Sequence, residues 1–409
     1  MAVATRARAT ALAQAACSAG VRPAGAAAAP LRPMKVALAH EYFAAHGGAE
    51  RVVEVLHAMW PEAPVYTFFH DRGRYGDLGG WDVRTSYLQQ FPIGGGLHRV
   101  LLPLYPSAAR RLRVADDTDV VLVSTSAFIK GLRLADRTVE VAYCHSPTRY
   151  LWDWRDEYLR DEVPGPLRGA VNELLARLRE TDRAFATRVD RWIANSSIVA
   201  QRIQRYYDRE SEVVYPPVDV DTFTAQRDRG DFWVYVGRLS AYKRADIAVR
   251  AFARLGMRLV VVGDGRERAA LESIARDSSL RPMGNITFAG RLDDATLRQL
   301  LGAARGLIFP AEDDFGIVCV EALASGAPVV ALAAGGAPEI VRDGIDGALV
   351  ATADPDAFAD AVLRVEQRAW DVDELCRSAR RFDVSRFRDR IRSVVDDAHA
   401  RGRRTRGIA

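Results

Sequence analysis

The sequence predicts an α/β protein made of two Rossmann-like parallel-sheet domains that face each other across a cleft. The chain has 409 residues, which exceeds the roughly 100–200 residues of one ordinary domain. Short apolar runs alternate with longer amphipathic stretches, as strands alternate with crossover helices in a parallel sheet. The proline-marked passage VYPPVDVD at 214–221 divides two such series. Ligand sites of open parallel sheets lie at the carboxyl ends of the strands, so function is expected on those loops.

Each half of the chain supplies its own set of apolar, strand-like runs. In the first half these are 35–39, 65–69, 120–124, 139–143 and 191–195. In the second half they are 232–236, 258–262, 286–289, 306–309, 328–332 and 347–350. The predicted domains are 34–213 and 214–384, followed by a helix at 385–400 that crosses back to the first domain and a disordered basic tail at 401–409.

Composition narrows the class of protein. Hydrophobic residues make up 49% and charged residues 27%, with 57 basic against 53 acidic side chains, a balance that does not indicate nucleic-acid binding. The four cysteines are scattered, and no apolar run approaches the roughly 20 residues of a membrane span. We therefore expect a cytoplasmic globular protein with reduced thiols.

The first 33 residues are rich in alanine and arginine and contain no acid. This composition favours a disordered extension, or a true start at Met34, over a secretory signal, whose apolar stretch is missing.

Two sequence features of the first domain place polar chemistry at strand ends. In HEYFAAHGGAERVVEVL, Gly47 and Gly48 precede an amphipathic helix. Such a loop lets backbone amides approach a phosphate, although a simple tight turn explains the pair equally well. In VEVAYCHSPTRYLWDW, the strand ends directly in His145, which favours a functional histidine in the cleft over a structural one.

In the second domain, FWVYVGRLSAYKRADIAV places Arg238 and Lys243 on a loop before a helix. Two cations there oppose the helix dipole unless an anion lies between them, so the pattern favours a diphosphate over a solvated pair. Gly263 and Gly265 of VVVGDGRERAAL form a similar loop that either approaches the nucleotide or turns the chain.

The densest pattern is GLIFPAEDDFGIVCVEALASGAPVVA, in which a buried strand leads to acids, a glycine and a helix. Gly316 permits a tight turn, and the amides of Phe315, Gly316, Ile317 and Val318 are expected to point toward phosphate or sugar oxygens. Asp313 and Glu321 are candidates for binding vicinal hydroxyls. Helix capping explains an acid near the start of this helix but not Glu321 within it.

These motifs, together with IANSSIVAQRIQRYY, VVYPPVDVDTF and FAGRL, make the chain from about 34 to 400 resemble the family 4 retaining glycosyltransferases of GT-B fold, in particular their bacterial mannosyltransferase branch. The resemblance implies that the first domain holds the acceptor and the second the nucleotide-sugar donor. It implies transfer of a hexose, mannose from GDP-mannose, to a glycan or lipid-linked hydroxyl in cell-envelope polysaccharide or glycolipid synthesis.

The resemblance also assigns roles to particular positions. The glycine loop, Gly47 and Gly48, faces the donor phosphates, and His145 lies beside the sugar. Arg238 and Lys243 grip the diphosphate. Further donor contacts fall on Gly263, Arg291, Leu292, Phe315, Gly316, Ile317, Val318 and Glu321. The family's first glutamate is Asp313 here, one methylene shorter, so the sugar contact departs from the family pattern.

The implied reaction is a front-face displacement with retention, which requires no metal and no cofactor besides the donor substrate. Three alternatives stay open at this point: a donor with uracil as its base, a nucleotide-sugar epimerase, and a nucleotide-sugar-binding protein without turnover.

A basic, apolar stretch at 96–114, GLHRVLLPLYPSAARRLRV, suggests a peripheral contact with an anionic membrane surface at the inner face of the plasma membrane. A helix packed on the first domain with a solvated basic face is the alternative, and the two prolines favour it.

Overall fold

The computed structural model describes residues 33–91, 101–226, 228–276 and 284–405. The chain divides into two units, Met1–Met34 and Lys35–Ala409, of which the second contains both sheets. The extension predicted at 1–33 lies outside the described residues except for its last position.

The first sheet is parallel and has seven strands in the order β3-β2-β1-β4-β5-β6-β7. The strands are β1 (Val36–His40), β2 (Val65–Thr67), β3 (Val83–Thr85), β4 (Val120–Thr125), β5 (Val139–Cys144), β6 (Arg191–Ala194) and β7 (Ser211–Val213). Five of them are the predicted strands. The other two, β3 and β7, are three-residue edge strands whose side chains are largely outside the core, so they lack the apolar run of a buried strand.

The second sheet is also parallel, with six strands in the order β10-β9-β8-β11-β12-β13. Its strands are β8 (Phe232–Val236), β9 (Arg258–Val262), β10 (Ile286–Gly290), β11 (Leu307–Phe309), β12 (Val329–Leu332) and β13 (Gly347–Val350). All six coincide with predicted runs. The prediction of two Rossmann-like sheets is therefore confirmed.

Helices connect the strands of both sheets. Those of the first sheet are α1 (Gly48–Met59), α2 (Arg72–Tyr75), α3 (Tyr105–Arg111), α4 (Arg155–Asp161), α5 (Arg168–Ala186) and α6 (Ser197–Tyr207). Those of the second are α7 (Ala245–Leu255), α8 (Arg268–Ala275), α9 (Asp294–Ala303), α10 (Ile317–Ala324), α11 (Ala337–Ile340), α12 (Pro355–Glu366) and α13 (Val372–Ala379).

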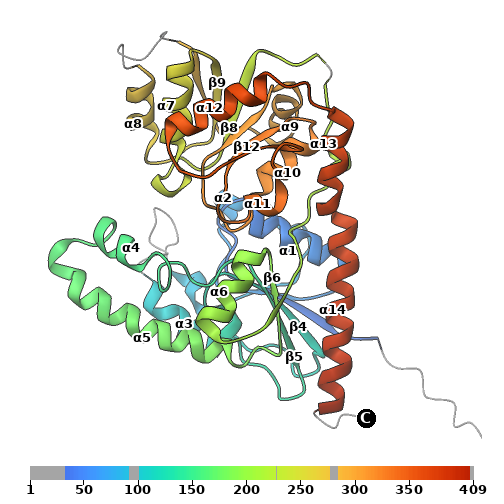
Figure 1. The fold of residues 1–409 in the computed structure, drawn as a ribbon. Helices are drawn as coiled ribbons and strands as arrows, with labels where there is room; N and C mark the ends of the chain where they lie inside the picture. Colours follow the sequence, from blue (N-terminus) through green and yellow to red (C-terminus); the bar gives the residue numbers. More distant parts are fainter. Residues whose placement is uncertain (1–32, 92–100, 227, 277–283, 406–409) are drawn as a thin grey trace, which may run out of the picture. The chain divides into compact units, whose positions relative to one another are not determined.

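The last helix, α14 (Val384–Thr405), contacts β4, β5 and α1 of the first sheet (Figure 1). The predicted return to the first half of the chain is therefore present, and the ring of Phe387 lies edge-on to Tyr143 of β5 at 5.7 Å. The tail predicted to be disordered from residue 401 is helical as far as residue 405. Two backbone hydrogen bonds join the linker to the start of this helix, from Val218 N to Phe382 O and from Val384 N to Val218 O, both 3.0 Å.

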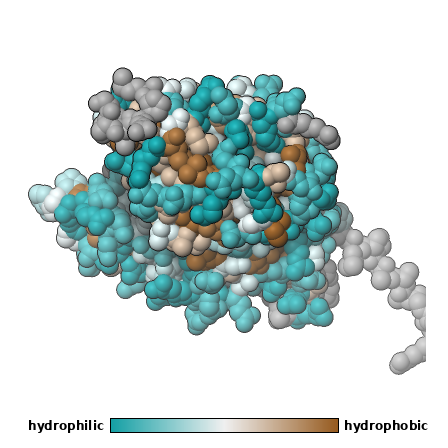
Figure 2. All heavy atoms as spheres, turned by 45° about the horizontal axis from the view of Figure 1, so that its top comes forward, coloured by the Kyte–Doolittle hydropathy of each residue, from teal (hydrophilic) through white to brown (hydrophobic). Residues whose placement is uncertain are grey.

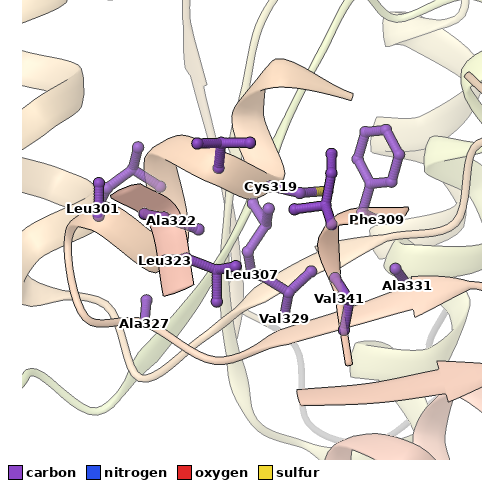
Figure 3. Packing of buried hydrophobic residues seen from close by; sticks show 14 of the residues in the cluster. Leu301, Leu307, Phe309, Cys319, Ala322, Leu323, Ala327, Val329, Ala331 and Val341 are labelled. Atoms are coloured by element: carbon purple, nitrogen blue, oxygen red, sulfur yellow. The ribbon is translucent and has the colours of Figure 1, made fainter. Parts of the chain in front are cut away.

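Helix α10 lies in the core of the second sheet, which explains why its sequence is apolar on nearly every face. Its residues pack against β11 and β12, with Cys319, Leu323 and Val329 fully buried (Figure 3). A helix that is apolar all round must be enclosed by other elements. Burial of α10 fixes the loop that precedes it, which carries the predicted acids.

The surface in Figure 2 is mostly hydrophilic, with small apolar patches separated by polar side chains. Among the described residues, no helix is long and apolar enough to cross a membrane.

The segment predicted to contact a membrane is only partly described, since 92–100 lie outside the described residues. In the described part, Leu101 and Leu102 are buried in the core of the first sheet. Arg110 and Arg111 lie over the rings of Phe185 and Tyr87. The expectation that these two leucines form an exposed apolar face is wrong, because their side chains pack in the core. The two prolines lie in the first turns of a short 3-10 helix and of α3, where a missing N–H is tolerated.

Replacing Leu323 by alanine should lower the free energy of unfolding by about 2–5 kcal/mol, because a cavity opens in a core that is fully closed around it. Leu363→Ala is the matched control: that side chain is 42% exposed on α12, and its loss should cost far less. Urea unfolding followed by circular dichroism measures both. Equal losses in the two variants would contradict this description of the core.

Candidate functional site

Polar side chains of the first sheet gather where β1, β4 and β5 end. These strands are neighbours, and their register places His40 beside Ser124. His40 Nδ1 lies 3.0 Å from Ser124 Oγ, and Ser124 Oγ lies 2.7 Å from His145 Nε2. On the other side of His40, Nε2 lies 3.7 Å from Oε1 of Glu50 on α1. The predicted site residue His145 is thus the end of a polar chain.

His145 is held in a neutral state by its surroundings. Burial, and to a smaller extent the nearby His40, lowers the pKa of His145 to about 3. Its backbone is fixed by a bond from His145 N to Thr125 O at 2.9 Å and by one from Asn195 Nδ2 to His145 O at 2.9 Å. The ring is therefore a neutral hydrogen-bonding group in a fixed place.

A buried acid holds the loop that follows His145. Asp182 of α5 is fully buried and accepts hydrogen bonds from Thr148 Oγ1 at 3.2 Å and Trp152 Nε1 at 2.9 Å. It also accepts from Tyr207 OH at 2.8 Å and forms an ion pair with the buried Lys130 at 2.6 Å. A buried carboxylate with four partners fixes the positions of the four side chains that bind it. The indole nitrogen of Trp152 is committed to this network.

A second buried acid, Glu41, holds the loop after β4. It follows β1 directly and accepts from Thr125 Oγ1 at 2.9 Å and from the backbone amides of Ala127 and Ile129 at 2.7 and 3.3 Å. The carboxylate thus satisfies the amides of a tight loop, and its role is structural.

The two glycines of the first loop meet different neighbours. Gly47 precedes α1 in extended conformation, and a Cβ there would lie 2.9 Å from Oε2 of Glu50. At Gly48, an added Cβ would lie 2.7 Å from Cδ1 of Ile317 at the start of α10. Gly48 therefore permits close approach of α1 to the second sheet's helix.

Ion pairs join the elements of the two sheets. Arg51 of α1 donates to Glu321 of α10 and lies 3.3 Å from Asp294 of α9. The Glu321 side chain is 6% exposed, so its charge needs this partner. Glu339 of α11 accepts from Ser197 N and Oγ at 2.8 and 2.9 Å, at the start of α6. Sequence reasoning identified Glu321 but neither Arg51 nor Glu339.

The acidic loop after β11 is met by cations from both halves of the chain. Lys243 forms an ion pair with Asp313, so two predicted catalytic residues lie in direct contact. Asp314 pairs with Arg149 at 2.7 Å and also with Arg202 of α6. The predicted loop therefore carries an acid–cation network that spans both sheets.

Two predicted cations lack such partners. Arg238, after β8, and Arg291, after β10, are both exposed. Neither side chain hydrogen-bonds or pairs with any residue in the described part of the chain. Arg238 lies on the same loop as Lys243, so one cation of the predicted pair is free and the other is bound to Asp313.

The remaining predicted donor contacts divide between backbone and core. Gly263 has a φ of +128°, and a Cβ there would lie 1.9 Å from Gly237 O, so this glycine packs one loop against another. Gly316, with a φ of +96°, begins α10 without a side-chain cap, which leaves the first amides of that helix available. The Phe315 ring is buried and stacks on Tyr215 at 5.6 Å, so only its backbone can serve a ligand.

The apolar side chains among the predicted donor contacts also pack against the hydrophobic core. Leu292 and Val318 are partly buried against the core of the second sheet, and Ile317 does the same while meeting Gly48.

One loop of the site escaped prediction. After β12, Gly335 and Gly336 cross directly over the acidic loop, with Gly336 N donating to Asp313 O at 2.8 Å. A Cβ on Gly335, whose φ is +64°, would lie 2.1 Å from that oxygen. The signal was available, because a glycine pair followed by a helix ends β12 as another ends β1.

The fold defines a two-domain protein of the GT-B class, in which exposed Arg238 and the uncapped start of α10 follow strands β8 and β11 of the second sheet. Within the described residues, no group of three or more His, Cys, Asp or Glu is arranged to hold a metal ion.

Comparison with known families identifies the chain. The family described as Glycosyltransferase Family 4 matches residues 46–222, and the family described as Glycosyl transferases group 1 matches residues 231–368. The chain belongs to the family 4 glycosyltransferases of GT-B fold. The predicted resemblance to that family is confirmed, while its mannosyltransferase branch stays a prediction.

Curated relatives carry the name D-inositol 3-phosphate glycosyltransferase. The protein of that name from Mycolicibacterium paratuberculosis is 35% identical over 192 residues, or 42% of this chain and 44% of its own length. That from Mycolicibacterium smegmatis is 35% identical over 198 residues, or 44% and 46%. The chain thus matches less than half the length of these relatives.

Solved structures share the fold at low identity. Anabaena HepE in complex with UDP has a TM-score of 0.65 at 18% identity, covering 89% of this chain and 100% of its own. Sucrose-phosphate synthase from Thermosynechococcus elongatus has a TM-score of 0.64 at 19% identity, covering 90% and 99%.

The low pKa of His145 gives stability a defined pH dependence. In the unfolded chain the ring takes up a proton near pH 6.5, whereas in the folded protein it does so only near pH 3. Between these values the unfolded state binds more protons, so the free energy of unfolding falls as pH falls, by up to about 1.4 kcal/mol per unit.

His145→Gln should therefore flatten the stability profile between about pH 6.5 and about 3 relative to wild type. Urea midpoints at several pH values measure the slope, with His399→Gln as a control near the end of α14. Parallel profiles for wild type and His145→Gln would show that His145 is not held neutral.

Proposed function

We propose that this protein transfers a hexose from a nucleoside diphosphate sugar to a hydroxyl group of an acceptor, with retention at the anomeric carbon. The observation that carries the proposal is the β8 loop, where Arg238 stands exposed and unpaired among the described residues beside Lys243. A diphosphate is the anion that two such cations and the uncapped start of α10 suit best.

The chemistry needs charge neutralisation more than a nucleophile. The bond from the anomeric carbon to the phosphate oxygen breaks, and the bond to the acceptor oxygen forms on the same face. The acceptor's proton passes to the departing phosphate oxygen. Arg238 and Lys243 stabilise the negative charge that grows on the diphosphate, which is where the transition state most needs support. We propose no cofactor beyond the donor itself.

The acids are proposed to bind hydroxyl groups of the donor. Glu321 is placed for the ribose and Asp313 for the sugar, in keeping with the family pattern. In the present structure Arg51 holds Glu321 and Lys243 holds Asp313. Donor binding then exchanges part of each ion pair for hydrogen bonds to hydroxyls, so neither carboxylate is left without a partner.

For the donor we propose GDP-mannose, on the likeness of the quoted motifs to the mannosyltransferase branch. UDP-glucose is the second candidate, because HepE has been solved with UDP-glucose. For the acceptor we propose a hydroxyl of a glycan, a lipid-linked glycan or a polyol phosphate. The last follows the name of the curated relatives.

A thermal-shift screen with GDP, UDP, GDP-mannose, UDP-glucose and UDP-N-acetylglucosamine tests the donor. The true donor should raise Tm in proportion to the logarithm of its concentration above Kd. In Glu321→Ala the shift should shrink for every nucleotide of that base, whatever the sugar. In Asp313→Glu, which restores the usual family residue, binding should persist and the preference among sugars should change.

If Glu321→Ala kept the full nucleotide shift, the ribose assignment would be withdrawn. If no nucleotide shifted Tm, the proposed donor class would be wrong.

Arg238→Ala should lower turnover about 10²-fold or more while leaving the unfolding midpoint unchanged, because this exposed side chain supports the transition state and has no structural partner among the described residues. Arg250→Ala, an exposed arginine on the following helix α7, is the matched control and should leave the rate intact.

Release and transfer of radiolabelled sugar measure the rate. Near-normal turnover in Arg238→Ala would defeat the assignment. Nucleotide binding without any sugar transfer in wild type would favour a binding protein over an enzyme.

A further inference from the structure

The polar chain that ends at His145 contains a single hydroxyl between two imidazole rings. Ser124 is fully buried and lies within hydrogen-bonding distance of His40 Nδ1 on one side and His145 Nε2 on the other. A hydroxyl has one hydrogen to donate. It therefore donates to one ring and accepts from the other, and the chain has two possible directions.

The direction is set at the far end of the chain. Glu50 Oε1 lies 3.7 Å from His40 Nε2, and both side chains are largely buried, at 15% and 4% exposure. A carboxylate there favours a proton on the nitrogen that faces it. A neutral His40 then carries its proton on Nε2 and offers a lone pair at Nδ1, so Ser124 donates to His40.

With its hydrogen given to His40, Ser124 accepts from His145. His145 must then carry its proton on Nε2, which leaves a lone pair on Nδ1. Burial that lowers the pKa of His145 to about 3 keeps the ring neutral throughout. Nδ1 has no partner in the described part of the chain and is not among its buried unpaired atoms, so it is open to a ligand.

We propose that Glu50, His40 and Ser124 are positioning residues that fix the tautomer of His145, so that Nδ1 presents a hydrogen-bond acceptor to a substrate hydroxyl. The tautomer assignment stands on this geometry, and only the hydroxyl ligand rests on the proposed function. This hydrogen-bonded chain also explains the glycine at position 47. A larger residue there would displace the Glu50 carboxylate, because an added Cβ would lie 2.9 Å from Glu50 Oε2.

The same geometry makes the tautomer of His145 depend on His40. Without the lone pair at His40 Nδ1, Ser124 donates to His145 Nε2 instead. His145 then releases its Nε2 proton to solvent and takes one up on Nδ1, so the open nitrogen becomes a donor without a change of charge.

Nitrogen-15 NMR of the full-length protein labelled at histidine tests the tautomer without substrate. The chain has seven histidines, and the His145 signals are assigned by their loss in His145→Gln. We expect a protonated Nε2 and an unprotonated Nδ1 at alkaline pH.

In His40→Phe, His145 should instead carry its proton on Nδ1. Among the described residues Ser124 then has no acceptor except His145, and a buried hydroxyl hydrogen without a partner is costly. His70→Phe is the matched control, because this histidine after β2 bonds to Gly76 O and takes no part in the hydrogen bonds of Ser124, so the His145 signals should stay unchanged. If His40→Phe does not fold, Ser124→Ala replaces it and should abolish the preference for one tautomer.

A protonated Nδ1 in wild type at alkaline pH would overturn the proposal. So would a tautomer that does not respond to His40→Phe or, in its place, to Ser124→Ala. Because no measurement depends on sugar transfer, a failure of the proposed enzyme activity would leave this result standing, and the reverse also holds.

Discussion

The pairing of Glu321, Asp313 and Asp314 with cations from other parts of the chain is the interaction on which the arrangement depends. Glu321 has almost no access to water, and a carboxylate in that position is costly unless a cation or hydrogen-bond donors meet it. Arg51 meets it from the other sheet, and Arg149 does the same for Asp314. These contacts hold strand ends of two separate sheets at a common place, which neither sheet achieves alone. The loops that carry His145 and Arg238 take their positions from strands anchored in this way.

The fold was largely readable from the sequence because buried parallel strands are apolar throughout. β12 and β8 show this, and their apolar runs match the observed bounds closely. Edge strands such as β3 lack that signal, since their side chains face water. For Leu101 and Leu102 the apolar pattern was present but its partner was not evident. Apolar residues beside arginines suit a membrane contact and a core helix equally, and only tertiary packing distinguishes the two.

The sequence indicated individual candidate residues but not the contacts between them. Lys243 and Asp313 were both singled out, yet they lie 70 positions apart and nothing local shows that they pair. Glycines show the same limit. Gly263 fits the pattern of a phosphate loop, but the room it leaves is filled by the carbonyl of Gly237. A glycine in sequence indicates close approach of some group, and the fold decides whether that group is a ligand or the chain itself.

The two cations of the β8 loop are not equivalent, and the difference bears on how an anion enters the site. Lys243 is paired with Asp313, whereas exposed Arg238 has no side-chain partner among the described residues. In the proposed reaction, an arriving diphosphate would meet Arg238 without displacing any of those residues. It would reach Lys243 only as Asp313 gave up part of its ion pair, which requires hydroxyl groups to replace the lysine at that carboxylate. A bare phosphate cannot supply those hydroxyls, while a sugar attached to the phosphate can. If the proposed donor is right, the pair of Lys243 with Asp313 would therefore couple binding of the diphosphate to the presence of the sugar and favour the complete donor over the nucleotide alone.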